Sequence, residues 1–195
     1  MKKLIIALFI SINCYCQEDK FLDNPDPSEL VGKVVENKRD DFTNDYTVQV
    51  NAMRGNRFKN GDKLTEGLFV EPIFLSTFYR ITTSKKFAYI NLEILQRPSF
   101  DNYCVSDYDG QLFIMLDNKE IIKLKQFSEV DCDTTLDPKY NLSIEDLNKL
   151  TTHKIDKIRI YYTKGYGDYT IREDKKALVL STFQVLKEQI SRIIQ

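Results

Sequence analysis

Two short acidic segments contain the side chains best suited to hold a cation. Asp107 and Asp109 lie in the segment SDYDG, and Asp131 and Asp133 lie in VDCD. Carboxylate oxygens in loops are the usual ligands of Ca²⁺, and paired carboxylates also act as acid and base in glycoside hydrolysis. The first segment matches only a fragment of a calcium-binding loop. These four residues are therefore candidates for a Ca²⁺-stabilised adhesion module or a carboxylate-dependent secreted hydrolase, and solvated turns are the alternative interpretation.

The other catalytic sets of common hydrolases are missing from the sequence. His153 is the single histidine, and neither a G-x-S-x-G nor an H-E-x-x-H motif is present. His153 follows a predicted helix, where a polar residue that favours the helix dipole needs no catalytic role. We therefore expect a non-enzymatic protein without a cofactor, rather than an enzyme.

Tyrosines and basic residues crowd one predicted hairpin over residues 157–173. Tyr161 and Tyr166 lie beside Arg159 and Lys164. Exposed tyrosines flanked by cations suit the recognition of a protein, peptide or glycan. Ordinary cross-strand packing is the alternative. These four residues form the predicted binding surface.

The same hairpin has a predicted register. The turn residues KGYGD place Tyr162 opposite Tyr169 and Ile160 opposite Ile171. Both tyrosines then share the face of the two isoleucines, so we predict that Tyr162 and Tyr169 belong to the core.

The N-terminal residues 1–16 have the layout of a secretory signal peptide. A positive start, MKK, precedes the apolar run LIIALFISI and the polar segment NCYCQEDK. The apolar run is too short to span a bilayer, which takes about 20 residues. Cys14 and Cys16 suit the positions before a cleavage site, so we predict cleavage before Gln17, a flexible lead-in over 17–27, and export to the periplasm or the medium. An uncleaved or lipid-linked anchor is the alternative.

Charge and hydropathy limit the partners. The chain has a formal net charge of −1, and removal of Lys2 and Lys3 with the signal peptide makes it more acidic. Proteins that bind nucleic acid carry a basic face, so nucleic acid is not an expected partner. No later segment is apolar enough for a membrane span. The sequence leaves the oligomeric state open.

Cleavage would leave two cysteines, Cys104 and Cys132, in a compartment where disulfides persist. Two apolar runs on either side of residues 117–119 predict a β-hairpin with Ile114 opposite Ile122. Extending this register places the two cysteines opposite each other, although the DYDG segment could introduce a bulge. We predict a disulfide. A redox-active or nucleophilic cysteine is the less favoured interpretation. A redox pair is commonly a C-x-x-C motif, which is absent, and a nucleophilic cysteine needs a nearby base, for which the chain has only His153.

The remaining pattern predicts strands before helices. We expect a short helix over 28–38. Alternating or β-favouring residues predict strands at the ranges 44–52, 67–81 and 85–95. Pro72 limits the second of these to an edge strand, a bulge or a break.

Two helices are expected late in the chain. Ser143 is a suitable N-cap for a helix that ends near Thr152. The apolar stripe of residues 179–194 predicts a C-terminal helix that packs on the sheet.

Together these elements predict a single α+β domain over 28–195, built from an antiparallel meander of hairpins with one face covered by the C-terminal helix. The expected function is that of an exported binding or interaction protein stabilised by one disulfide.

Overall fold

A computed structural model describes most of the domain. The described residues are 30–58, 61–66, 68–70, 73–95, 104–105 and 110–194. The predicted signal peptide and lead-in lie outside these ranges, as do Asp107 and Asp109. Within the described ranges, no helix combines the length and apolar character needed to cross a membrane.

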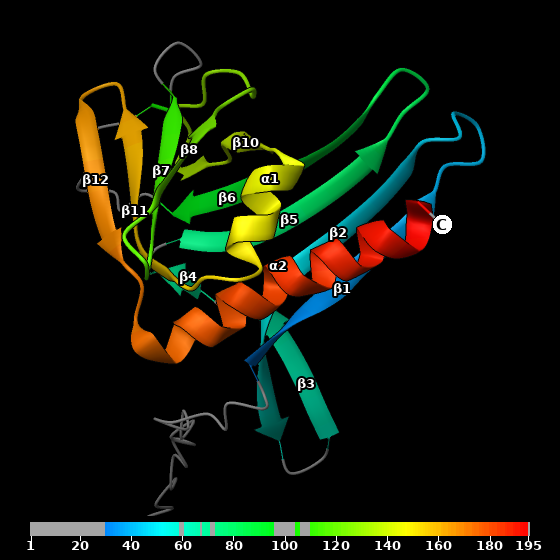
Figure 1. The fold of residues 1–195 in the computed structure, drawn as a ribbon, viewed down its shortest axis with the longest axis horizontal. Coiled ribbons are helices and arrows are strands. Elements are labelled where there is room, and N and C mark those ends of the chain that lie inside the picture. The colour runs from blue at the N-terminus through cyan, green and yellow to red at the C-terminus, as the bar shows by residue number, and fades with distance from the viewer. Residues whose placement is uncertain are drawn as a thin grey trace, which may run out of the picture.

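An antiparallel sheet forms the larger part of the fold (Figure 1). Its path runs β1-β2-β5-β6-β10, with β3 paired to β2, β4 to β5, and β9 to β6. The strands are β1 (Leu30–Arg39), β2 (Tyr46–Phe58), β3 (Gly61–Glu66), β4 (Leu68–Val70), β5 (Ile73–Ile81), β6 (Lys86–Leu95), β9 (Thr135–Leu136) and β10 (Lys139–Leu142).

A second, four-stranded antiparallel sheet stands at one end of the first, with the order β12-β11-β7-β8 (Figure 1). Its strands are β7 (Gln111–Leu116), β8 (Ile121–Lys125), β11 (Ile155–Tyr162) and β12 (Gly165–Thr170). The helices are α1 (Ile144–Leu150) and α2 (Glu173–Ile194). The predicted α+β class is confirmed, but the two late hairpins join each other through β7 and β11 in a separate sheet instead of extending one meander.

The helix expected over 28–38 is wrong, because this segment forms β1. Val34 of β1 pairs with Val50 of β2, and the register shifts between Val34 and Glu36. Valine favours strands, and glycine inside a helix costs about 1 kcal/mol relative to alanine. Gly32 also brings β1 against the backbone of α2, which no larger residue would allow. Pairing with β2 and packing on α2 therefore outweigh the weak helical signal.

The C-terminal helix α2 packs on the large sheet as predicted. Val179, Phe183, Leu186 and Ile190 are buried along one side of it. In Figure 1, α2 runs obliquely across β1 and β2. Its buried side forms one core with the inner faces of both sheets.

The short helix α1 begins as predicted. The Ser143 hydroxyl accepts a hydrogen bond from the backbone amide of Asp146 at 3.0 Å and donates one to its carboxylate at 2.6 Å. Leu142 and Leu147, on either side of the cap, are buried. This cap fixes the direction in which the chain leaves β10.

The Tyr140 side chain is buried completely, and its hydroxyl has no hydrogen-bond partner among the described residues. Burial raises the pKa of this phenol well above its usual value of 10. An unpaired buried hydroxyl costs desolvation energy without a compensating bond.

We expect Tyr140→Phe to leave the free energy of unfolding unchanged or to raise it by up to about 1 kcal/mol. Tyr162→Phe is the matched control: the Tyr162 hydroxyl lies 2.9 Å from that of Tyr169, so its removal should destabilise by about 1 kcal/mol. Urea unfolding of both variants measures the difference. An equal loss in the two variants would show that the Tyr140 hydroxyl is paired in solution.

Asp156 joins three parts of the fold. Its carboxylate accepts hydrogen bonds from Lys119 of the β7–β8 turn and Lys176 of α2, each at 2.7 Å. These two ammonium groups lower the pKa of Asp156 to about 2.

This low pKa predicts a pH-dependent stability. A depressed native pKa stabilises the fold above the unfolded value near 4, and the contribution is lost as the pH falls from 4 towards 2. Asp156→Asn should therefore lower the free energy of unfolding by about 1 kcal/mol at pH 5 and hardly change it at pH 2. Urea unfolding at both pH values tests this, with Asp41→Asn, in the exposed β1–β2 turn, as control. A cost that is the same at both pH values would contradict the assignment.

Candidate functional site

The predicted binding surface lies on the outer face of the second sheet, but the hairpin that carries it has a different register from the expected one. Tyr162 pairs with Gly165 instead of Tyr169, and Ile158 pairs with Tyr169. The loop is shorter than predicted because Gly165 adopts a φ of +127°, which closes the turn directly after Lys164.

The second glycine of the hairpin has another role. The ring of Tyr169 lies over Gly167, where a Cβ atom would come within 2.8 Å of the Tyr169 hydroxyl oxygen. This position lets Tyr169 reach the hydroxyl of Tyr162. Both tyrosines are partly buried and pack against the core, so the face predicted for them is confirmed despite the register error, although neither is fully buried. Burial and the neighbouring Tyr169 raise the pKa of Tyr162 above its usual range.

An aromatic row crosses three strands on the outer face. Tyr166 of β12 and Tyr161 of β11 form a cross-strand pair with ring centroids 5.9 Å apart. Phe113 of β7 continues the row at 5.2 Å from Tyr161. Tyr166 is 59% exposed, and Tyr161 and Phe113 are half-buried. The predicted exposure of Tyr166 is therefore confirmed, and Phe113 extends the surface.

Two cations lie on this aromatic row. The Arg159 guanidinium is 3.9 Å from the centre of the Tyr166 ring, and the Lys123 ammonium is 5.0 Å from that of Phe113. Asp168, the cross-strand partner of Arg159, holds the guanidinium in place: its carboxylate accepts two hydrogen bonds from Arg159, at 2.6 and 2.7 Å. Arg159 in turn lowers the pKa of Asp168. The planar guanidinium is therefore oriented before any ligand arrives.

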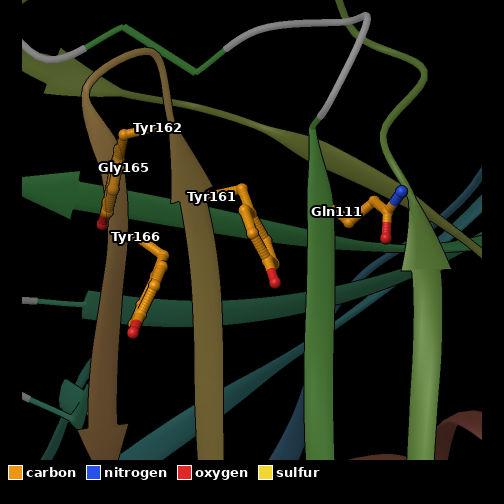
Figure 2. Close-up of a pocket in the computed structure, with 5 residues that line it drawn as sticks. All are labelled: Gln111, Tyr161, Tyr162, Gly165 and Tyr166. Atoms are coloured by element: carbon orange, nitrogen blue, oxygen red, sulfur yellow. The ribbon is translucent and has the colours of Figure 1, made fainter.

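A hollow of about 430 Å³ opens beside the row. It is lined by Gln111, Tyr161, Tyr162, Gly165 and Tyr166 (Figure 2). These residues come from the start of β7 and from the turn end of the β11–β12 hairpin. Tyr161 and Tyr166 thus belong both to the aromatic row and to the wall of the hollow.

Basic side chains surround the aromatic row. Lys123 and Lys125 are exposed on β8, and Lys157 of β11 lies opposite Met115 of β7, in the same alternation as Arg159. Lys164 is exposed in the β11–β12 turn. Among the described residues of this face, the basic side chains therefore outnumber the acidic Asp168 of β12, although the whole chain is slightly acidic.

The disulfide lies against the turn of the β11–β12 hairpin and holds it in place. Cys104 and Cys132 are bonded, as predicted. Val105 and Asp131 pair beside the two cysteines, so the predicted register of the β7–β8 hairpin extends to this point. The Thr163 amide donates to the Cys104 carbonyl at 3.0 Å, and the Cys104 amide donates to the Thr163 hydroxyl at 3.3 Å. No pattern in the sequence predicts this contact between the disulfide and the β11–β12 turn.

The acidic segments are only partly described. The Asp131 carboxylate accepts hydrogen bonds from the backbone amides of Asp133 at 3.1 Å and Asp137 at 2.7 Å, which orders its own loop. Asp107 and Asp109 are not among the described residues. In the part of the chain that the structure describes, no three acidic, histidine or cysteine side chains are grouped as metal ligands. The calcium and hydrolase alternatives stay untested predictions.

His153 has a local structural contact. Its Nδ1 atom lies 3.0 Å from the Asp117 carboxylate, which also accepts a bond from the Lys154 amide at 3.3 Å. The pair joins the end of α1 to the β7–β8 turn.

The sequence predicts the β11–β12 hairpin as a binding surface but not the contribution of Gln111, Phe113 and Lys123, because these residues belong to a different hairpin. Their outward positions follow from the alternation of β7 and β8, yet nothing in the sequence shows that β7 pairs with β11. No known protein family, no characterised protein and no solved structure matches this chain. Its function must therefore be inferred from the geometry of this face.

Proposed function

We propose that this chain is an exported, non-enzymatic binding protein that holds an acidic ligand on the outer face of its second sheet. The observation that carries the proposal is the row of Tyr166, Tyr161 and Phe113, flanked by Arg159 and Lys123 and open to the 430 Å³ hollow.

The composition of the face supports a binding role. Tyrosine and arginine are enriched among residues that dominate binding energies, because each offers a large contact area together with a hydrogen-bonding group. The Asp168 carboxylate already orients Arg159, which reduces the entropy lost on binding. Excess positive charge favours an anionic ligand and speeds its association.

Two features support export. The N-terminal layout is that of a signal peptide, and the bonded pair of Cys104 and Cys132 is typical of proteins that mature in an oxidising compartment. A disulfide that positions the binding hairpin would persist there.

The proposal predicts which substitutions weaken binding. We expect Tyr161→Ala and Arg159→Ala each to weaken the binding of an acidic ligand by about tenfold, since truncation of a central interface residue commonly costs above 1 kcal/mol. The matched control is Phe42→Ala, because Phe42 is 98% exposed in the β1–β2 turn, far along the chain from this face.

The measurement is a calorimetric titration of the mature protein with two probes, an eight-residue peptide that alternates glutamate and threonine, and an oligogalacturonate. A peptide that alternates lysine and threonine serves as the charge control. Binding of neither acidic probe, or equal binding by Tyr161→Ala and Phe42→Ala, would contradict the proposed site.

A further inference from the structure

Strand β1 ends the first sheet and strand β12 ends the second, and the two strands differ in how their edges are protected. Among the described residues, β1 pairs only with β2 and β12 pairs only with β11. An open edge invites pairing with another chain, and proteins commonly protect such edges with charges and bulges.

The β1 edge has both protections. Its register shifts between Val34 and Glu36, and it carries Lys33, Lys38 and Arg39 as well. A bulged and charged edge is a poor template for another strand.

The β12 edge has neither protection. All its residues from Gly165 to Thr170 pair with β11 without a register shift. Its single charged residue, Asp168, is paired with Arg159. Figure 1 shows β12 at the outer margin of the second sheet. Alternate residues of such a strand direct their backbone N–H and C=O groups away from the neighbouring strand, where an added strand can bind them.

The surroundings of β12 fit an extended peptide. Gly165 and Tyr166 both line the 430 Å³ hollow, so the hollow lies beside the first residues of β12. A peptide strand on this edge would place alternate side chains towards the outer face. There they would meet Tyr166 of β12 first, and Arg159 and Lys157 of β11 one strand further on.

Charge selects an acidic peptide over a second copy of this chain. Pairing of two β12 edges would extend one sheet and bring the cations of β11, Lys157 and Arg159, towards the same cations of the second copy. Repulsion between like charges opposes that arrangement, whereas glutamate or aspartate side chains on a peptide would complement the face.

We propose that the partner is an extended acidic peptide segment that binds by adding a strand to the β12 edge. This inference rests on the proposed function, because it specifies the partner of the same face. Main-chain hydrogen bonds supply affinity in this mode, and alternate side chains supply specificity.

Backbone methylation of the peptide tests the proposal on the mature protein. Two versions of the glutamate–threonine peptide are titrated, one N-methylated at the glutamates and the other at the threonines. In an added strand, amides of only one set face β12. We expect one methylated peptide to bind at least about tenfold more weakly and the other to bind nearly as well as the unmodified peptide.

Hydrogen exchange gives a second measurement. The unmodified peptide should slow exchange at amides within Gly165–Thr170 and leave those of β1 unchanged. Equal binding by the unmodified and both methylated peptides would overturn strand addition while the proposed function stands. Binding of the oligogalacturonate but not of the peptide would also overturn strand addition and leave the proposed function standing.

Failure of all acidic probes would overturn the proposed function and this inference together. A free protein that sediments as a dimer with protected β12 amides would overturn only the inference, because a second copy would then occupy the edge.

Discussion

Replacement of both bonded cysteines, Cys104→Ser with Cys132→Ser, is expected to lower the free energy of unfolding by about 3–4 kcal/mol. The bond closes a loop with a sequence separation of 28, and a crosslink of that length removes this much entropy from the unfolded chain. Urea unfolding of the double variant measures the loss. The wild type unfolded in a reducing agent should show the same loss, since it lacks the same bond.

The disulfide should also affect the binding face. Cys104 holds Thr163 through two hydrogen bonds, one between the two backbones and one from the Cys104 amide to the Thr163 hydroxyl. Thr163 is the first residue of the turn that connects Tyr162 to Gly165. We therefore expect the double variant, in the range where it is folded, to bind an acidic peptide more weakly than the wild type. A stability loss below about 1 kcal/mol would show that the bond removes little entropy from the unfolded chain.

The second large effect is expected at Gly32. A Cβ atom there would lie 2.5 Å from the Thr182 Cα and 2.8 Å from the Thr182 nitrogen of α2. Both atoms belong to the helix backbone, so no side-chain rotation relieves the contact. The Gly32 amide also donates to the Ser181 hydroxyl at 2.8 Å, which fixes the close approach of β1 and α2.

Gly32→Ala should therefore destabilise by about 3 kcal/mol, at the upper end of the usual range for overpacking. The matched control is Val35→Ala on the same strand, where the side chain is exposed and the cost should stay below about 0.5 kcal/mol. Urea unfolding compares the two variants. A similar stability for both would show that α2 moves away from β1 at little cost.

Local patterns in the sequence determined the elements whose signals come from neighbouring residues. The hairpin with Ile114 opposite Ile122, the Ser143 cap and the apolar stripe of α2 are all confirmed, because turn chemistry, capping and side-chain periodicity act over a few residues. The disulfide was predictable for the same reason, since it lies on an extension of that hairpin register.

Tertiary packing decided the elements where local preference was weak. Residues 30–39 became a strand because β2 and α2 both contact them. The close contact with α2 also explains why a glycine is needed at position 32. The register of the β11–β12 hairpin was set by the conformation of Gly165, since either glycine of KGYGD could have closed the turn.

The candidate site shows the same division. Local sequence places Arg159, Tyr161, Lys164 and Tyr166 on one hairpin, because residues near a turn are close in any register. Only the tertiary structure placed β7 beside β11, and with it Phe113, Gln111 and the lysines of β8. Pairing between strands distant in the chain depends on how whole faces bury against one core, and no short segment of sequence records that choice.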